Sequence, residues 1–198
     1  MQLPITLLTN IFYAFADVYA DGTVNSGNPT VDTQFVFGAV EEAKAKTEAQ
    51  AAVAMPDSHR AKKRQGTTVQ GAVQQLYNFK TQQRNLKVLL SIGSGSSDAN
   101  FSLATSTPTT RAAFARTALQ LITDWGMDGI DIDWEYPNNA TDRANYVALV
   151  AAVRAAFDNY TAAYDLGYQF QISVVLPVSP VYQSYYDIPA MNLYVNNW

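Results

Sequence analysis

The residues best suited to chemistry in this sequence are acids at alternating positions of one short segment, Asp131, Asp133 and Glu135. Side chains along a β-strand point to opposite faces in turn, so on a strand these three carboxyl groups share one face. Carboxyl groups two positions apart on a strand lie within about 7 Å of one another. Because burying several ionised carboxylates is costly, one of them is expected to hold a proton at neutral pH. The pattern favours general acid catalysis, with Glu135 as the proton donor, Asp133 tuning it and Asp131 holding Asp133.

The opposite face of the same segment is apolar, because Ile130, Ile132 and Trp134 alternate with the acids. This alternation indicates a buried strand and argues against a solvated edge strand, which is one alternative interpretation. A hard-cation site is a second alternative, since carboxylate oxygens also bind calcium or magnesium. Such sites usually draw ligands from loops as well, so catalysis is the favoured interpretation.

The elements that must position these acids follow from the hydrophobic pattern. Short apolar runs predict strands over residues 11–18, 86–92, 129–135 and 170–176. Amphipathic patterns between them predict helices over residues 68–83, 110–125 and 142–164. This alternation implies right-handed βαβ units and a parallel sheet, either doubly wound or closed as a (β/α)8 barrel. The acids would then lie at the carboxyl end of the third strand, where barrel enzymes place their active sites.

Residues that favour helix ends and turns refine these predictions. A stretch of Ser, Thr and Pro offers N-cap residues for the helix over 110–125, and Gly126 stands where that helix should end. The connection over residues 19–67 contains a turn-like DGTV and, over 41–55, a run of good helix formers. Connections of this length more often have a function or secondary structure of their own than neither.

Composition excludes several classes of function. The chain has 198 residues, a size typical of one domain, and a net charge of -4, which argues against a nucleic-acid partner. The absence of cysteine removes thiolate catalysis and disulfides, and the single histidine, His59, lies in a basic run over 59–64 that we interpret as solvated. We identify no signal peptide and no membrane span. Asn-x-Ser/Thr sequons occur at Asn100, Asn139 and Asn159.

The run DGIDIDWEYP over 128–137 resembles the signature of glycoside hydrolase family 18, Asp-x-x-Asp-x-Asp-x-Glu, which closes the fourth strand of that family's barrel. All four acids match, Asp128 included. Residues 85–94 resemble the family's third strand, with Ser91 and Gly93 matching and Ser94 replacing a second glycine. Residues 11–16 and 172–177 resemble the second and fifth strands.

The resemblance, which is closest to fungal-type endochitinases, implies an α/β fold in which residues 1–198 form an incomplete (β/α)8 barrel of approximately strands 2 to 5 of 8. The first strand and strands 6 to 8 would be lacking, as would the Met-x-Tyr-Asp motif expected after YVNNW. We therefore expect a fragment, a mis-predicted gene product or a half-barrel that assembles with a partner, and little or no activity from the isolated chain. Exposed sheet edges would permit self-association.

By resemblance, the activity would be a retaining, substrate-assisted cleavage of β-1,4 bonds between N-acetylglucosamine units of chitin. Glu135 would protonate the glycosidic oxygen, and the acetamido carbonyl of the sugar would attack its own anomeric carbon. Asp133 would polarise the acetamido nitrogen and share a hydrogen bond with Asp131, which Ser91 would support. The resemblance implies no cofactor and no metal, and extracellular secretion of the full-length protein.

Further residues are assigned lesser roles. Asp128 and Gly93 are expected to support the site, and Tyr136, Tyr13 and Phe15 to bind substrate. Core packing is the competing interpretation for four aromatic residues, Tyr13, Phe15, Phe101 and Trp134. A tyrosine group after the last strand is a weaker candidate for the cleft mouth, Tyr182, Tyr185 and Tyr186.

Two alternative functions share the motif. One is a chitin- or glycan-binding lectin on the same barrel, which retention of the acid at Glu135 argues against. The other is an endo-β-N-acetylglucosaminidase acting on N-glycans.

Overall fold

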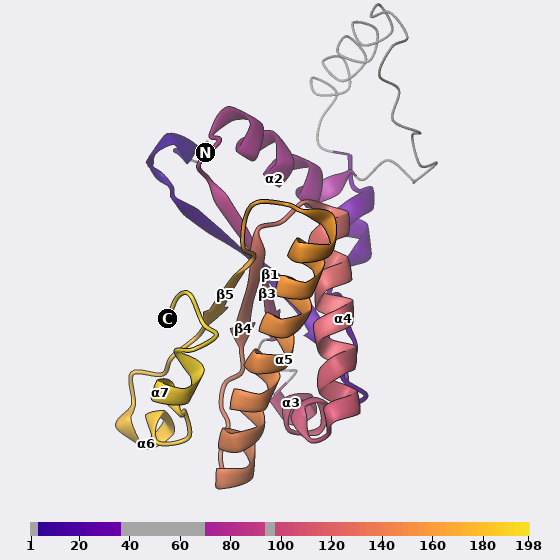
Figure 1. Ribbon diagram of the computed structural model, residues 1–198. Helices are drawn as coiled ribbons and strands as arrows, with labels where there is room; N and C mark the ends of the chain where they lie inside the picture. Colours follow the sequence, from indigo (N-terminus) through magenta and orange to yellow (C-terminus); the bar gives the residue numbers. More distant parts are fainter. Residues whose placement is uncertain (1–3, 37–69, 94–97) are drawn as a thin grey trace, which may run out of the picture.

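The four apolar runs pair into one sheet in the computed structural model, which describes residues 4–36, 70–93 and 98–198. The strands are β1 (Asn10–Val18), β3 (Lys87–Gly93), β4 (Gly129–Asp133) and β5 (Gln171–Val174). They lie parallel and side by side in chain order (Figure 1). The predicted strands are therefore present, although β4 ends two residues earlier than its apolar pattern does.

A fifth strand that the sequence did not predict, β2 (Val24–Ser26), pairs antiparallel with β1 at the edge of the sheet. The predicted turn precedes it: the carboxylate of Asp21 accepts a hydrogen bond from the backbone N–H of Thr23 (2.9 Å), and Gly22 takes a φ of 87°. The helix expected over 41–55 and the basic run over 59–64 lie outside the described residues.

The predicted helices correspond to α2 (Gly71–Gln82), α4 (Pro108–Trp125) and α5 (Ala140–Tyr164). The side chain of Thr107 accepts from the backbone N–H of Thr110 to cap α4, and Gly126 ends that helix in the left-handed conformation. The shorter helical segments were not predicted, namely η1 (Ile5–Leu7), η2 (Thr30–Gln34), α3 (Asp98–Thr105), α6 (Pro180–Gln183) and α7 (Ile188–Met191).

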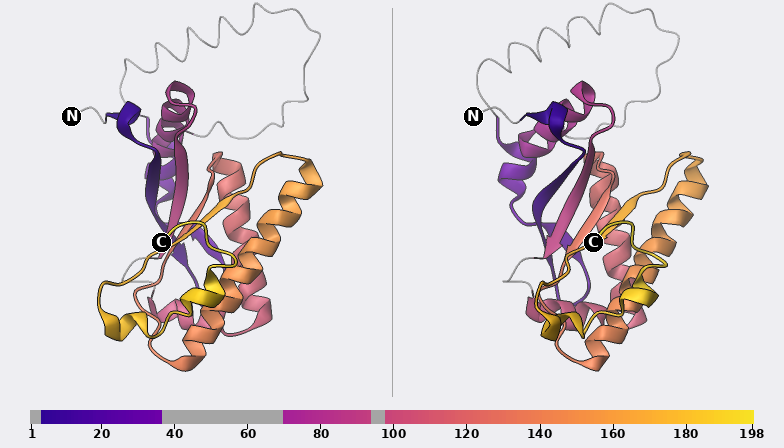
Figure 2. Two further views of the ribbon diagram at one scale, coloured as in Figure 1. Left: turned by 60° about the vertical axis from the view of Figure 1, so that its left-hand side comes forward. Right: turned by 90° about the vertical axis from the view of Figure 1, so that its left-hand side faces the viewer.

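The order of the strands decides between the two predicted architectures. From β1 to β5 the parallel strands follow the chain without the reversal that defines a doubly wound sheet. The long helices α4 and α5 lie side by side against one face of the sheet (Figures 1 and 2). The structure is therefore a sector of a (β/α)8 barrel, as the family resemblance implied, whereas the hydrophobic pattern alone leaves both architectures open.

The core lies between this sheet and its helices. Neighbouring strands contribute a row of fully buried side chains, Leu90, Ile130 and Ile172. Phe114 of α4 and Phe157 of α5 are equally buried. Each such side chain contributes about 1.5–3 kcal/mol through the area it removes from water, so burial of this face holds the strands in register.

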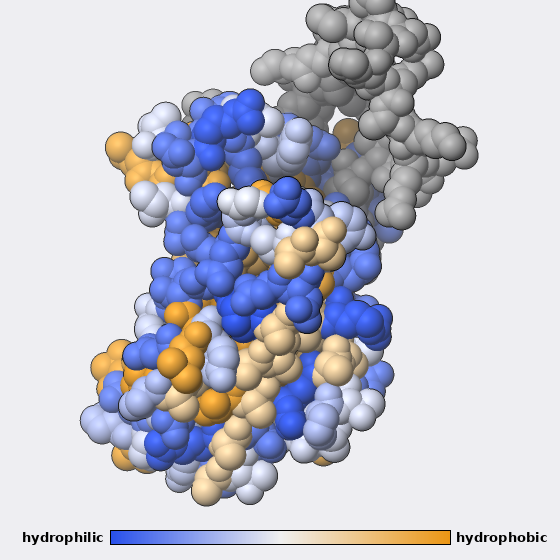
Figure 3. Space-filling view, in the orientation of Figure 1, coloured by the Kyte–Doolittle hydropathy of each residue, from blue (hydrophilic) through white to orange (hydrophobic). Residues whose placement is uncertain are grey.

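The outward side of α5 carries small apolar residues. Exposed alanines, among them Ala144, Ala155 and Ala162, lie along this helix, where Figure 3 shows a pale apolar stripe.

Within the described ranges, none of the helices combines the length and the apolar character needed to cross a membrane.

The last residues of the chain return alongside β5. Asn197 pairs in parallel with Ser173, and the backbone N–H of Asn196 donates to the carbonyl of Ile172 (2.8 Å). Arg154 of α5, only 7% exposed, donates to the carbonyl of Phe170 (2.8 Å) and to the side chain of Asn196 (3.0 Å). This buried guanidinium joins α5, β5 and the returning segment.

Gly93 marks a point where two strands approach too closely for a side chain. Its φ is 132°, and a Cβ at this position would lie 2.1 Å from the carbonyl oxygen of Asp133.

Gly126 also has a positive φ, 66°, but a Cβ there would meet nothing within 4 Å. We predict that Gly126→Ala lowers the free energy of unfolding by about 1–2 kcal/mol. Gly93→Ala should lower the free energy of unfolding by more than about 3 kcal/mol, and urea unfolding measures both variants. Equal losses in the two variants would contradict the close approach of Gly93 to Asp133.

Candidate active site

Asp131 is the buried end of the acidic row. On β4 it lies directly between Ser91 of β3 and Ser173 of β5, and the three side chains are 4–5% exposed. The hydroxyl of Ser91 donates to Oδ2 of Asp131 at 2.7 Å. A buried carboxylate is tolerated when such donors replace water, so this hydrogen bond fixes the inner end of the row.

The opposite face of the strand is covered by helices. Ile130 and Ile132 are fully buried, and Trp134 is 1% exposed. The Trp134 ring stacks on Phe101 of α3, with centroids 5.3 Å apart, and lies 5.1 Å from the ring of Tyr146 of α5. Phe101 and Trp134 therefore belong to the core, and the alternation predicted from the sequence holds through the end of β4.

Exposure rises along the row toward its outer end. Asp131 is buried, Asp133 is half-buried, and Glu135 is exposed two residues beyond the last residue of β4. Parallel barrel strands present their carboxyl ends to the active-site face, and Glu135 lies on that side. The arrangement can deliver a proton to a molecule bound there while Asp133 contacts the same molecule.

Two tyrosines lie beside the exposed acid. The ring of Tyr136 stacks on Tyr182, with centroids 4.4 Å apart and planes 22° from parallel, and Tyr182 is 41% exposed. The negative charge of Glu135 raises the pKa of the Tyr136 phenol, and a hydrogen bond between the two side chains acts in the same direction. This aromatic pair borders the site at its outer end.

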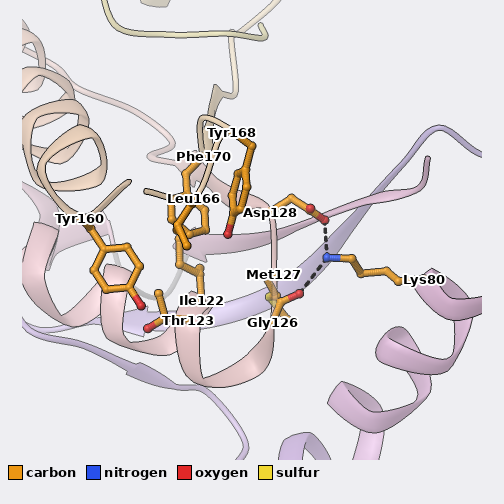
Figure 4. A pocket seen from close by; sticks show the side chains of 10 residues that line it. All are labelled: Lys80, Ile122, Thr123, Gly126, Met127, Asp128, Tyr160, Leu166, Tyr168 and Phe170. Atoms are coloured by element: carbon orange, nitrogen blue, oxygen red, sulfur yellow. Dashed lines mark hydrogen bonds and ion pairs between the residues drawn. The ribbon is translucent and has the colours of Figure 1, made fainter. Parts of the chain in front are cut away.

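Asp128 lies at the other end of β4. Its Oδ2 accepts from the backbone N–H of Val88 (2.8 Å) and from Nζ of Lys80 (2.8 Å). Together with Tyr160 and Tyr168 it lines a pocket of about 300 Å³ (Figure 4). Asp128 therefore holds the start of β4 and does not join the row of Asp131, Asp133 and Glu135, and its supporting role in the site stays a prediction.

The two aromatic residues predicted on β1, Tyr13 and Phe15, have different surroundings. Tyr13 pairs in register with Leu90, so it points toward the helices, where its ring meets Trp125 edge-on at 6.5 Å. Its hydroxyl donates to Asp32 of η2. The prediction that Tyr13 binds substrate is corrected by this position. Phe15 lies where the register shifts between Ala14 and Ala16 and is 41% exposed, so its substrate contact stays a prediction.

The cation alternative finds no support in the described part of the chain. Among the described side chains, those of residues 4–36, 70–93 and 100–198, no group of three or more His, Cys, Asp or Glu residues is placed to hold a metal ion.

Comparison with known proteins gives a family match over the whole chain. The sequence profile described as "Glycosyl hydrolases family 18" matches residues 1–198. The chain is 40% identical over 179 residues to Chitinase 1 of Aphanocladium album, and 36% identical over 181 residues to Endochitinase 1 of Metarhizium anisopliae. Each match covers 90% of this chain and 38% of the relative, so the chain spans about two fifths of the length of these relatives.

Solved structures support the fold. A chitinase from Trichuris suis aligns with a TM-score of 0.73 at 23% identity, over 99% of this chain and 43% of that one. A chitinase from Bacillus thuringiensis aligns with a TM-score of 0.76 at 20% identity, over 98% of this chain and 35% of that one.

The hydrogen bond between Ser91 and Asp131 leads to a stability prediction. Ser91→Ala removes a donor from a buried carboxylate, so we expect the free energy of unfolding to fall by about 1–3 kcal/mol. Ser173→Ala is the matched control, because it removes an equally buried serine hydroxyl on the other neighbouring strand. Urea unfolding of both variants measures the difference, and the same loss in both would refute a special contact at Ser91.

The charge of Glu135 leads to a pH prediction. Ionising Tyr136 would place a second negative charge beside Glu135, so Glu135→Gln should lower the pH at which Tyr136 ionises. Tyrosine 13Cζ NMR between about pH 9 and pH 12 reports this ionisation, with Tyr136→Phe to assign the resonance. Tyr168 is the internal control: burial, then the charge of Asp128, raises its pKa, so its titration should stay unchanged. An unmoved Tyr136 midpoint would mean that Glu135 does not lie beside it.

Proposed function

We propose that this chain, which belongs to the glycosyl hydrolases of family 18, carries the catalytic carboxylates of a chitinase that cleaves β-1,4 bonds between N-acetylglucosamine units. The observation that carries the proposal is the acidic row of Asp131, Asp133 and Glu135, which runs from a buried, hydrogen-bonded end to an exposed end. The names of the relatives, a chitinase and an endochitinase, support the same activity.

In the proposed mechanism, Glu135 donates its proton to the glycosidic oxygen as the bond to the leaving sugar breaks. The acetamido carbonyl oxygen of the substrate attacks the anomeric carbon from the other side, which makes the reaction retaining and removes the need for a nucleophile from the protein. Water then attacks the anomeric carbon and releases the acetamido oxygen from it, while Glu135 takes a proton from that water. An exposed carboxyl at the carboxyl end of the strand suits this exchange of protons with substrate and water.

Asp133 is proposed to orient and polarise the acetamido nitrogen, and Asp131 to hold Asp133 through a hydrogen bond. Ser91 holds Asp131 in turn at 2.7 Å. These contacts begin in the core, so in this proposal they fix the position of the Asp133 carboxylate relative to the sheet. The chemistry needs one acid and one orienting carboxylate, and it calls for no metal or cofactor.

Aromatic rings at the outer end are proposed to bind the sugars. The stacked pair of Tyr136 and Tyr182 presents ring surface beside Glu135, and Phe15 is partly exposed. Aromatic faces suit the apolar faces of pyranose rings, while tyrosine hydroxyls can bond to the sugar hydroxyls.

The direct test is Glu135→Gln, which keeps the shape of the side chain and removes its proton. We predict that cleavage of chitotetraose falls by at least about 100-fold, while the affinity for the same sugar by calorimetry is unchanged. Asp124→Asn on the exposed side of α4 is the matched control and should cleave like the parent. Reactions are run with protein in excess over substrate, so that slow cleavage by the isolated chain remains measurable.

Cleavage by Glu135→Gln at the parental rate would remove the proposed acid. A high-mannose glycopeptide assayed beside chitotetraose separates the remaining possibilities. Preference for the glycopeptide would assign an endo-β-N-acetylglucosaminidase. Because little or no activity is expected from the isolated chain, a lectin is excluded only by measurable cleavage by the parent that Glu135→Gln abolishes.

A further inference from the structure

The backbone that carries the exposed acid extends beyond the sheet. On the β3 side the register of β4 ends at Asp133, and on the β5 side it ends at Ile132. Glu135 therefore projects from a segment that the paired strands no longer hold. A general acid must keep its position within a fraction of an ångström to be efficient, so the contacts of this segment decide how well Glu135 is placed.

Two buried hydroxyl groups bond from the helix side, one to the paired end of β4 and one to the unpaired segment that follows it. The hydroxyl of Tyr146 on α5 donates to the carbonyl of Ile132 at 3.2 Å, and the hydroxyl of Tyr186 donates to the carbonyl of Trp134 at 3.0 Å. Each carbonyl belongs to the peptide group that precedes an acid, Asp133 in the first case and Glu135 in the second. The two bonds thus repeat at the spacing of the acids.

The two tyrosines are themselves rigidly packed. Tyr146 is fully buried and Tyr186 is 3% exposed, and their rings lie 5.6 Å apart. The Tyr146 ring also contacts Trp134, which stacks on Phe101. Neither hydroxyl can exchange its carbonyl for water without leaving the core, so each bond is costly to lose.

Tyr146 stays a donor over a wide pH range. Burial raises the pKa of its phenol well above the ordinary value, and the charges of Tyr186, Asp131 and Asp133 act in the same direction. Its hydroxyl therefore stays protonated at pH values at which an ordinary tyrosine ionises, and it can donate to the carbonyl of Ile132 there.

We propose that Tyr186 is a positioning residue for Glu135: its hydroxyl holds the peptide plane of Trp134 and Glu135, and Tyr146 does the same for Asp133. Tyr186 follows β5 and is 52 residues from Trp134 in sequence, so the bond ties the acid to the next βα unit of the barrel. This inference rests on the proposed function, because it assigns the acid role to Glu135.

The experiment uses a pair of neighbouring residues that occurs once in the chain. Trp134–Glu135 is the only Trp-Glu pair, since Trp125 precedes a glycine and Trp198 ends the sequence. Labelling with 13C at the tryptophan carbonyl and 15N at glutamate therefore gives a single carbonyl–amide correlation in NMR. That correlation reports the peptide plane that Tyr186 is proposed to hold.

Tyr186→Phe keeps the ring and removes the hydroxyl. We expect the Trp134 carbonyl resonance to move upfield, and the order parameter of the Glu135 amide to fall from about 0.85 toward about 0.6. For chitotetraose, kcat should fall by about 10- to 100-fold with KM unchanged, because the acid is misplaced while the binding surface is kept. Tyr164→Phe, which removes the hydroxyl of an exposed tyrosine at the end of α5, should change none of these quantities.

The outcomes separate this inference from the function on which it rests. In a folded Tyr186→Phe variant, an unmoved carbonyl resonance with an unchanged order parameter overturns the positioning role, whether or not the parent cleaves chitotetraose. A moved resonance supports the hold on the peptide plane whether or not the chain cleaves chitotetraose, and the proposed function is tested separately by Glu135→Gln. If Tyr186→Phe does not fold, the unmutated chain decides: a Trp134 carbonyl at the position of a free carbonyl overturns the inference.

Discussion

A hydrogen bond inside the sheet, from Ser91 to Asp131, anchors the chemistry of this protein to its core. A carboxylate that is 5% exposed is stable only when donors replace the water it has lost. The donor comes from the neighbouring parallel strand, so its place depends on the register of β3 against β4. Gly93 permits that register, because the two backbones meet there without room for a side chain. The sheet, and not a loop, therefore sets the inner end of the acidic row.

From that anchor the row reaches solvent through one strand of alternating character. The apolar positions between the acids pack under α3 and α5, and this burial fixes which way the acids point. The outer end is different, because Glu135 lies beyond the last paired residue. There the backbone bonds to the buried hydroxyl of Tyr186 and the side chain lies beside the Tyr136 and Tyr182 stack. A rigid base with an exposed end suits the acid role proposed for Glu135.

The sequence was sufficient where the signal is local. The acids and apolar residues of β4 alternate within one segment, and the capping residues of α4 lie next to that helix, so both could be predicted. The face of the sheet to which Tyr13 points could not be predicted, because it depends on pairing with Leu90 of another strand and on a shift in register between Ala14 and Ala16. Asp128 stands just before the predicted strand over 129–135, yet the motif does not show that its carboxylate binds the backbone N–H of Val88 and Nζ of Lys80, which belong to other elements of the fold. The bond from Tyr186 to Trp134 spans 52 residues and involves a backbone carbonyl, which leaves no pattern in the sequence.

The central claim is that a chitin oligomer binds against the exposed end of this row. A crystal structure of the chain with a non-hydrolysable, thio-linked chitotetraose tests it most directly. The account predicts that the sulfur joining two sugars lies about 3–3.5 Å from the carboxyl of Glu135, with the acetamido group of the adjoining sugar against Asp133. An oligomer seated in the pocket beside Asp128 and Lys80, or one that leaves Glu135 out of reach of any linkage, would contradict it.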